Sequence, residues 1–286
     1  MQADKEIEYF YRIYLQKRDK AFTLGSLAAL KKNITEWRKR HLRSYGRKVF
    51  RNNTQMVCRK LWSRFSVCDR KYDTPAMRLF LNDPESVLQG PCVKILKAGN
   101  TTTVILIDIN NIKLVVKRYN IKNFWHGIKR AVRNTRAAIS WRNAHQLMLL
   151  KIPTAKPVAL LEKRFGFFRG TSYFISEYAA GTPLQNYFSE NNLPEEKILI
   201  SEKIIALLNK LHSMQISHGD LKASNILIAG SEPVLIDLDA MRLHRFALCL
   251  RIAQRRDQQR LLKNWQNDMI IQDIFKEFLF KNLNKF

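Results

Sequence analysis

The spacing of apolar residues changes along this chain, from a strand-like pattern in the middle to a helical pattern toward the end. Five short apolar runs have the length and composition of β-strands. They cover residues 93–96, 103–107, 113–119, 157–161 and 171–178. Asn110-Asn111 separates the second run from the third and predicts a hairpin turn. The segment 124–150, which is basic and helical in its spacing, separates the third run from the fourth.

After Gly181 the pattern becomes helical. Pro194-Glu195-Glu196 predicts the start of a helix, because acidic residues in a first turn interact favourably with the helix dipole. The apolar face expected for this helix is formed by Ile198, Ile204, Ile205, Leu208 and Leu211. A hairpin is expected near 225–236, and two more helices at about 242–263 and 264–283. A part rich in strands is thus followed by a part rich in helices.

The N-terminal 74 residues are dense in cations and aromatic side chains. Residues 7–15 carry apolar side chains at helical spacing, whereas 49–67 is compatible with short strands. Asn82-Asp83-Pro84-Glu85 predicts a turn or a helix start. We expect residues 1–74 to form a basic extension that precedes the main fold.

The candidate chemistry lies around the hairpin. His218-Gly219-Asp220-Leu221-Lys222-Ala223-Ser224-Asn225 is followed by an apolar strand that ends at Asp237. Asp220 can accept a hydroxyl proton, while Asn225 and Asp237 offer the oxygen ligands that Mg²⁺ prefers beside the phosphates of ATP. A His-Gly-Asp sequence alone would favour an aspartate that caps its own turn. With Asn225 five residues after Asp220, the spacing instead favours the catalytic loop of a kinase.

Two lysines fit the same chemistry. Lys222 would balance the charge of the γ-phosphate, although an ordinary surface lysine is the alternative. Lys117 follows Leu114-Val115-Val116 within the run 113–119, and a lysine whose stem is packed by a strand can reach the α- and β-phosphates.

A loop and a strand end complete the predicted nucleotide site. Gly99, Asn100, Thr101 and Thr102 lie between two strands, where their backbone N–H groups could line the phosphates; a plain hairpin turn is the alternative. Glu177 lies at the boundary between the strand-rich and helical parts, where backbone groups would read the adenine edge.

Two features depart from the familiar kinase pattern. Asp239 stands where the D-F-G sequence has its glycine, and it could add a metal ligand, bind substrate or cap the next turn. No acid lies between Lys117 and Glu162, so the helix glutamate that usually pairs with the strand lysine has no counterpart. Its expected position falls near Ser140 or Asn143.

The net charge of the chain indicates what kind of partner it binds. The net charge is +26, from 50 Lys and Arg against 24 Asp and Glu, which calls for an acidic partner such as nucleic acid, anionic lipid or an acidic substrate. The charge is concentrated at 113–156, which holds no acid, and in the segment 242–263, where Asp257 is the single acid.

Other sequence features favour a protein on the cytoplasmic side. No apolar run approaches the roughly 18 residues that span a bilayer. Asp4, Glu6 and Glu8 do not suit a signal peptide. The cysteines show no CxxC pair, which is typical of reduced thiols; they are Cys58, Cys68, Cys92 and Cys249.

Three segments together resemble the bacterial lipopolysaccharide core kinases, the Kdo and heptose kinase family. They read HGDLKASNILI, VLIDLDAMR and LVVKRYN, and the stretches 141–145 and 152–157 are similar too. The resemblance covers roughly residues 90–265. It implies ATP-dependent phosphorylation, with Mg²⁺, of a sugar hydroxyl in the lipopolysaccharide inner core. The implied partners are the core saccharide and, peripherally, the anionic cytoplasmic face of the inner membrane.

The fold class expected from motif and resemblance is α+β, a bilobal protein-kinase-like fold. A small antiparallel N-lobe would occupy 75–178, and a reduced, mostly helical C-lobe with the catalytic loop would occupy 179–286. No A-P-E sequence follows Asp237, which suits a saccharide acceptor or a minimal protein Ser/Thr kinase. A pseudokinase that binds membrane or partners is a further alternative, and a nucleic-acid binder is an unfavoured one supported by charge alone.

Overall fold

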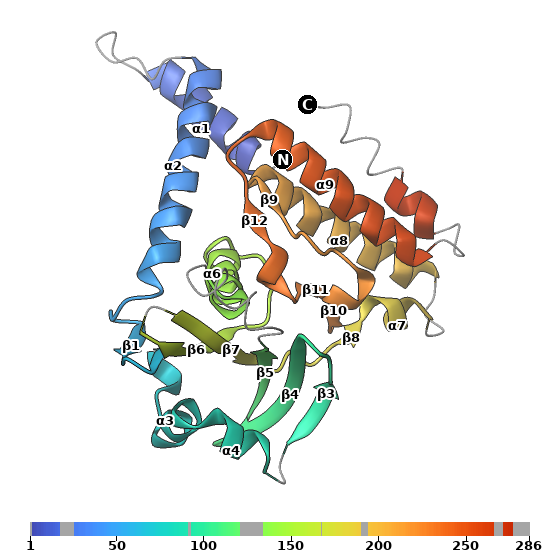
Figure 1. The fold of residues 1–286 in the computed structure, drawn as a ribbon. Coiled ribbons are helices and arrows are strands. Elements are labelled where there is room, and N and C mark those ends of the chain that lie inside the picture. The colour runs from blue at the N-terminus through green and yellow to red at the C-terminus, as the bar shows by residue number, and fades with distance from the viewer. Residues whose placement is uncertain are drawn as a thin grey trace. The chain divides into compact units, whose positions relative to one another are not determined.

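The computed structural model describes residues 2–17, 26–90, 93–120, 134–166, 168–189, 194–265 and 271–276 (Figure 1). The chain forms two compact units, Met1–Tyr45 and Gly46–Phe286. Unit 1 consists of helix α1 (Gln2–Lys17) and most of helix α2 (Leu27–Lys48), which confirms the helix expected around 7–15. Within this unit Lys31 of α2 forms an ion pair of 2.6 Å with Glu8 of α1.

Unit 2 contains a seven-stranded antiparallel sheet with the strand order β1-β2-β6-β7-β5-β4-β3. Its strands are β1 (Met56–Lys60), β2 (Arg64–Asp69), β3 (Lys94–Lys97), β4 (Thr102–Ile109), β5 (Ile112–Tyr119), β6 (Pro157–Phe165) and β7 (Phe168–Glu177). All five expected strand runs are confirmed. The hairpin turn is confirmed as well, because Asn110 and Asn111 have φ values of 55° and 60°, the left-handed pair that a tight hairpin requires.

The sheet is larger than the sequence suggested, and it begins earlier in the chain. Strand β2 pairs with β6 in antiparallel register, so β1 and β2 are part of the sheet rather than of an extension. The structure accordingly divides the chain between Tyr45 and Gly46, not after residue 74. The pairing partner of β2 lies about ninety residues further along, and such non-local pairing is invisible in a local pattern.

Helices frame the sheet. Helices α3 (Pro75–Asn82) and α4 (Pro84–Leu88) follow β2, and α4 confirms the helix start expected at Pro84. Helix α6 (Arg136–Leu149) begins after Thr135, whose hydroxyl accepts a hydrogen bond of 3.1 Å from the Ala138 N–H. It confirms the second half of the helix expected at 124–150, whereas residues 121–133 lie outside the described part of the chain.

The remainder of unit 2 is mainly helical. It contains α7 (Leu184–Ser189), α8 (Pro194–Ser213) and α9 (Ala247–Leu262), with short turns η1 (Arg70–Tyr72), η2 (Ala223–Asn225), η3 (Leu238–Ala240) and η4 (Lys263–Trp265) along the unit. Small sheets join β8 (Thr182–Pro183) to β10 (Ile226–Ala229) and β11 (Glu232–Leu235), and β9 (Ile216–Ser217) to β12 (Arg242–Leu243). The hairpin predicted near 225–236 is therefore present as β10 and β11.

Three details of the helical part differ from expectation. Arg242 and Leu243 pair with β9, so the helix predicted from 242 begins only at Ala247. Ile198 is 44% exposed, because the buried stripe of α8 starts at Ile200. Of the helix expected at 264–283, residues 264–265 belong to η4 and 271–276 are helical; the rest lie outside the described residues.

Buried side chains form two separate apolar clusters. One lies against the large sheet and includes Phe80, Val116 and Tyr173. The other gathers around α8 and the β10–β11 hairpin, and it includes Leu147 from α6. The two clusters give the strand-rich and the helical part each its own core.

Two further findings concern membrane-spanning helices and cysteines. No helix within the described ranges combines the length and apolar character needed to cross a bilayer. In the same ranges Cys58, Cys68 and Cys249 are free thiols.

The buried histidines predict how stability depends on pH. Burial lowers the pKa of His145 to about 3 and that of His212 to about 4, from the usual 6.5. Between pH 6.5 and these values the unfolded chain binds protons that the folded chain does not, so stability falls as the pH falls. We expect a loss of about 1.4 kcal/mol per pH unit for each histidine, measured by urea unfolding between pH 7 and pH 5.

A variant separates this effect from general acid sensitivity. His145→Gln removes one titrating group, so its free energy of unfolding should depend less steeply on pH than that of the wild type. Equal slopes for the two proteins would show that His145 is not held neutral.

Candidate active site

The loop that carries Asp220 is held against the segment that follows Asp237. Gly219 has a φ of 82°, and a Cβ at this position would lie 2.3 Å from the carbonyl oxygen of Ala240 in η3. Only glycine permits both the left-handed backbone and this approach. The close contact brings the loop 218–225 alongside residues 237–240.

A second anchor for the same loop comes from helix α9. Asp257 is 3% exposed, and its Oδ2 accepts hydrogen bonds from the backbone N–H groups of His218 (2.8 Å) and Gly219 (3.0 Å). The His218 ring donates from Nε2 to the Ile236 carbonyl oxygen at 3.0 Å, and burial lowers its pKa, so the ring is neutral. Sequence reasoning did not assign Asp257 to the site. Its signal was visible, however, since it is the single acid in a strongly basic helix.

Two side chains of the loop, those of Lys222 and Asn225, form hydrogen bonds with Asp220. Asn225 donates from Nδ2 to the Asp220 backbone oxygen at 2.8 Å and to its Oδ2 at 3.3 Å. Lys222 donates to the same Oδ2 at 3.0 Å. The Asp220 carboxylate is thus oriented by two donors on one oxygen, while its side chain stays 31% exposed and open to an acceptor group.

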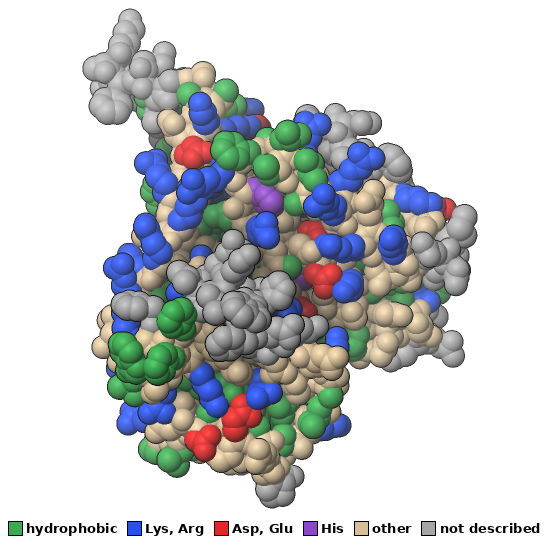
Figure 2. Space-filling view, in the orientation of Figure 1, with side chains coloured by type: hydrophobic (Ala, Val, Ile, Leu, Met, Phe, Trp, Pro, Cys, Tyr) green, Lys and Arg blue, Asp and Glu red, His purple; other side chains and the backbone are tan. Residues whose placement is uncertain are grey.

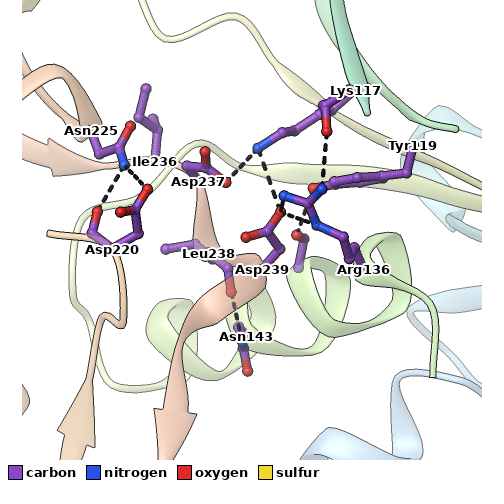
Figure 3. A network of polar contacts seen from close by, with 12 residues as sticks. Lys117, Tyr119, Arg136, Asn143, Asp220, Asn225, Ile236, Asp237, Leu238 and Asp239 are labelled. Carbon is purple, nitrogen blue, oxygen red and sulfur yellow. Dashed lines mark hydrogen bonds and ion pairs between the residues drawn. The ribbon is translucent and has the colours of Figure 1, made fainter. Parts of the chain in front are cut away.

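Lys117 and Asp237, 120 residues apart in the chain, form a hydrogen-bonded ion pair (Figure 3). Lys117 projects from β5, which lies between β4 and β7, and its side chain is only 14% exposed. Asp237 adopts a left-handed backbone, with φ 60° and ψ 61°, at the end of the β10–β11 hairpin. In Figure 3 Asp220 and Asn225 lie beside Asp237, on the side away from Lys117.

Asp239 extends this ion pair to helix α6. Its side chain is 8% exposed, and Oδ2 lies 3.9 Å from the Lys117 Nζ and 2.7 Å from an Arg136 guanidinium nitrogen. Arg136, the first residue of α6, also donates to the Thr102 hydroxyl at 3.2 Å. The carboxylates of Asp237 and Asp239 therefore join Lys117 of β5 to Arg136 of α6, and Arg136 adds Thr102 of β4.

The two aspartates differ in proton affinity. Burial opposes ionisation of Asp237, but the adjacent Lys117 ammonium outweighs it and holds the pKa below its usual value. Burial and the neighbouring charge of Asp237 raise the pKa of Asp239. Each carboxylate therefore influences the charge of the other, and Arg136 and Lys117 supply the compensating cations.

The missing helix glutamate has a structural explanation. Ser140 shares a hydrogen bond of 3.1 Å with Tyr119, and Asn143 donates to the Leu238 and Met241 carbonyl oxygens at 2.8 and 3.0 Å. Neither serves Lys117. The charges are arranged differently from the familiar kinase pattern. Helix α6 contributes a cation, Arg136, instead of a glutamate, and the acid near Lys117 is Asp239, from the segment after the β10–β11 hairpin.

The predicted phosphate loop and hinge lie where the sequence placed them. Gly99, Asn100 and Thr101 form the turn between β3 and β4, and a Cβ on Gly99 would lie 2.9 Å from the Thr102 carbonyl oxygen. Thr102 is linked to the site through Arg136. Glu177 ends β7, and its carboxylate accepts from Tyr72 and, at 3.2 Å, from Lys156. The structure thus connects Thr102 to the Lys117–Asp237 pair, whereas the Glu177 side chain is engaged elsewhere.

The residues present fit a magnesium ion bound together with phosphates. Asn225 uses its amide nitrogen toward Asp220, which leaves Oδ1 as an oxygen ligand, and Asp237 uses Oδ1 toward Lys117, which leaves Oδ2. No cluster of three His, Cys, Asp or Glu side chains suited to a metal occurs in the described part. Mg²⁺ held mainly by phosphate oxygens and water does not require one.

Comparison with known proteins agrees with this geometry. Residues 94–279 match the model of the Lipopolysaccharide kinase (Kdo/WaaP) family. A segment of 77 residues is 35% identical to "Serine/threonine-protein kinase RAD53" of Saccharomyces cerevisiae (strain ATCC 204508 / S288c), and it covers 26% of this chain and 9% of that kinase. The matching region of the family model contains Lys117, Arg136 and the whole loop 218–225.

The network predicts a specific effect of neutralising Asp239. Asp239→Asn leaves Arg136 and Lys117 without one of their carboxylate partners, so Lys117 should be held less well. We expect phosphate transfer to fall by about tenfold or more, with an increased KM for ATP. Asp108→Asn, which changes an exposed aspartate on β4, is the matched control. A variant with unaltered kcat and KM would exclude Asp239 from positioning Lys117.

Proposed function

Because this chain belongs to the lipopolysaccharide kinase (Kdo/WaaP) family, we propose that it phosphorylates a sugar hydroxyl of the lipopolysaccharide inner core. Members of the family are kinases, so the chain is an ATP-dependent phosphotransferase. We further propose that the acceptor is a hydroxyl group of an inner-core sugar and that the reaction takes place at the cytoplasmic face of the inner membrane.

One observation carries the proposal: Lys117, Asp237 and the Asp220–Asn225 loop meet although they come from three separate segments. Lys117 pairs with Asp237, and the Ile236 N–H donates to the Asn225 carbonyl oxygen at 3.0 Å. A strand lysine, a metal-binding carboxylate and a catalytic aspartate at one place are the parts that phosphoryl transfer to a hydroxyl requires.

Asp220 is the proposed base. Lys222 and Asn225 occupy its Oδ2, which leaves Oδ1 to accept the proton of the acceptor hydroxyl as its oxygen attacks the γ-phosphorus, the bond to the bridging oxygen breaks and ADP leaves. Lys222, with a half-exposed side chain, then lies where it can neutralise charge on the transferring phosphoryl group.

The remaining residues bind the nucleotide. Lys117 would bind the α- and β-phosphates, and the turn Gly99-Asn100-Thr101-Thr102 would cover them with backbone N–H groups. Asn225 and Asp237 would hold Mg²⁺, which neutralises the charge on the β- and γ-phosphate oxygens when bound. Backbone groups next to Glu177 would contact the adenine.

The two apolar clusters support a bilobal, kinase-like arrangement. One cluster stabilises the sheet that carries Lys117, and the other stabilises the helices and hairpin that carry Asp220 and Asp237. The proposed site takes residues from both parts, as expected for a nucleotide site between two lobes.

Helix α9 provides a surface suited to an anionic membrane. Phe246, Leu248 and Ile252 are 71%, 67% and 46% exposed. Leu248 and Ile252 are four residues apart and so share a helix face, which exposed arginines flank at positions 245, 251, 255 and 256. Figure 2 shows many more basic than acidic side chains on the visible face. Apolar side chains bordered by arginines suit peripheral binding to anionic lipid.

A direct test uses Asp220→Asn with purified core oligosaccharide and radiolabelled ATP. Loss of the base should reduce transfer by roughly a hundredfold or more without altering the thermal midpoint. Asp273→Asn, at an exposed position in the segment 271–276, should transfer phosphate like the wild type. Undiminished transfer by Asp220→Asn would remove the base assignment.

The acceptor class is tested separately. The similarity to a yeast protein kinase favours a minimal protein Ser/Thr kinase as the second candidate, and casein is a suitable protein acceptor for the same assay. Transfer to casein but not to oligosaccharide would favour that candidate. Mass spectrometry of core oligosaccharide from cells lacking the protein should show the loss of one phosphate if the proposal holds.

Membrane binding by α9 predicts a second effect. Leu248→Asp combined with Ile252→Asp should weaken co-sedimentation with anionic phospholipid vesicles by about tenfold or more. Leu79→Asp, at a leucine of α3 that is 69% exposed, is the matched control. Wild-type binding should be released by high salt. Equal sedimentation of the α9 variant and the control would contradict the proposed face.

A further inference from the structure

A second basic site lies in unit 2, outside the active site. It is a pocket of about 400 Å³, a size in the range of small-molecule sites. Its lining residues come from 46–51, β1, β2, α6, β6 and β7, with Asn134 ahead of α6. None of the side chains assigned to phosphate transfer lines it.

The residues that line the pocket carry mainly positive charge. Six cations line the pocket, namely Arg47, Arg51, Lys60, Arg142, Arg164 and Arg169, against the single acid Glu162. Burying or crowding like charges is unfavourable unless a counter-charge is present. The composition therefore calls for an anion.

The one acid is already engaged. Glu162 is 1% exposed, it accepts from the Thr135 hydroxyl at 2.6 Å, and it forms an ion pair with Arg164. Arg164 in turn lies over the ring of Phe65 at 4.3 Å. Glu162 thus supplies one negative charge, and that charge is paired with Arg164.

Arg142 is the most important of the pocket cations that have no acid partner. Its guanidinium is partly buried, and burial lowers its pKa. No acid partner of Arg142 is found among the described residues. The backbone at Gly46 packs closely against the aliphatic part of the Arg142 side chain, because a Cβ on Gly46 would lie 3.1 Å from the Arg142 Cγ. Arg47, Arg51 and Lys60 likewise form no ion pair within the described ranges, and all three are exposed.

We propose that this pocket binds a phosphomonoester or pyrophosphate group, carried either by a soluble molecule or by a lipid headgroup. Guanidinium groups donate paired hydrogen bonds that match phosphate oxygens. Four cations without an acid partner favour a group with two or more negative charges over a single carboxylate. The inference does not depend on the proposed function, since the pocket shares no side chain with the phosphate-transfer site.

The test is a calorimetric titration of the full chain with inorganic pyrophosphate. All proteins in the titration also carry Lys117→Gln, which weakens phosphate binding at the proposed nucleotide site and lies outside the second pocket. This variant, with the pocket itself unaltered, is the wild-type reference and should bind one equivalent. Arg142→Gln should weaken binding by about tenfold or more, and Arg47→Gln by a smaller factor. Lys71→Gln, an exposed lysine outside the pocket, should bind like the wild type.

Circular dichroism would reveal whether Arg142→Gln folds poorly. In that case Arg47→Gln still tests the proposal, because Arg47 is exposed and its replacement should not disturb the fold. Absence of pyrophosphate binding by the wild type, or equal affinity of well-folded Arg142→Gln, Arg47→Gln and wild type, would overturn the proposal.

A vesicle assay separates the two sources of phosphate. Phosphatidylcholine vesicles containing phosphatidate are compared with vesicles containing phosphatidylserine at equal surface charge. A preference for phosphatidate that Arg142→Gln abolishes supports a lipid headgroup as the ligand. Unchanged vesicle binding, with weakened pyrophosphate binding, supports a soluble phosphorylated ligand.

Discussion

The ion pair between Lys117 and Asp237 joins the strand-rich and helical parts of this enzyme. Lys117 is fixed on a central strand with 14% of its side chain exposed, and Asp237 is fixed by a left-handed residue at a hairpin end. A pair so shielded from water is stronger than a surface ion pair, because the local dielectric is lower. Arg136, Asp239 and Thr102 are linked to it, so the pair lies at the centre of the polar network that we propose binds the nucleotide.

The pair also explains how a chain with a net charge of +26 maintains an acidic centre. Each site carboxylate has its own donors: Asp220 has Lys222 and Asn225, Asp237 has Lys117, and Asp257 has two backbone N–H groups. Buried or half-buried carboxylates require such partners to remain ionised. Part of the excess of cations lies elsewhere, on α9 and around the pocket of Arg142, the two places for which we propose anionic ligands.

Most of the fold was accessible from local pattern. The five strand runs, the Asn110-Asn111 turn and the helix start at Pro194 follow from apolar spacing and turn chemistry, and all were found. The failures have a common cause, namely packing between distant segments. Arg242 and Leu243 leave the expected helix because β9 offers them a partner, and Ile198 is exposed because α8 packs with a stripe that begins at Ile200. The sheet extends to β1 because β2 pairs with β6.

The sequence by itself determined the family and the candidate residues: the types and spacing of Asp220, Asn225 and Asp237 match the pattern of a kinase catalytic loop and its metal-binding carboxylate. Only the tertiary structure decided what supports them. Asp239 and Arg136 are 103 residues apart, and Asp257 lies 38 residues beyond Gly219, so no local pattern could pair them. An ion pair or a loop anchor is a property of distance in space, and folding alone brings such groups within reach of one another.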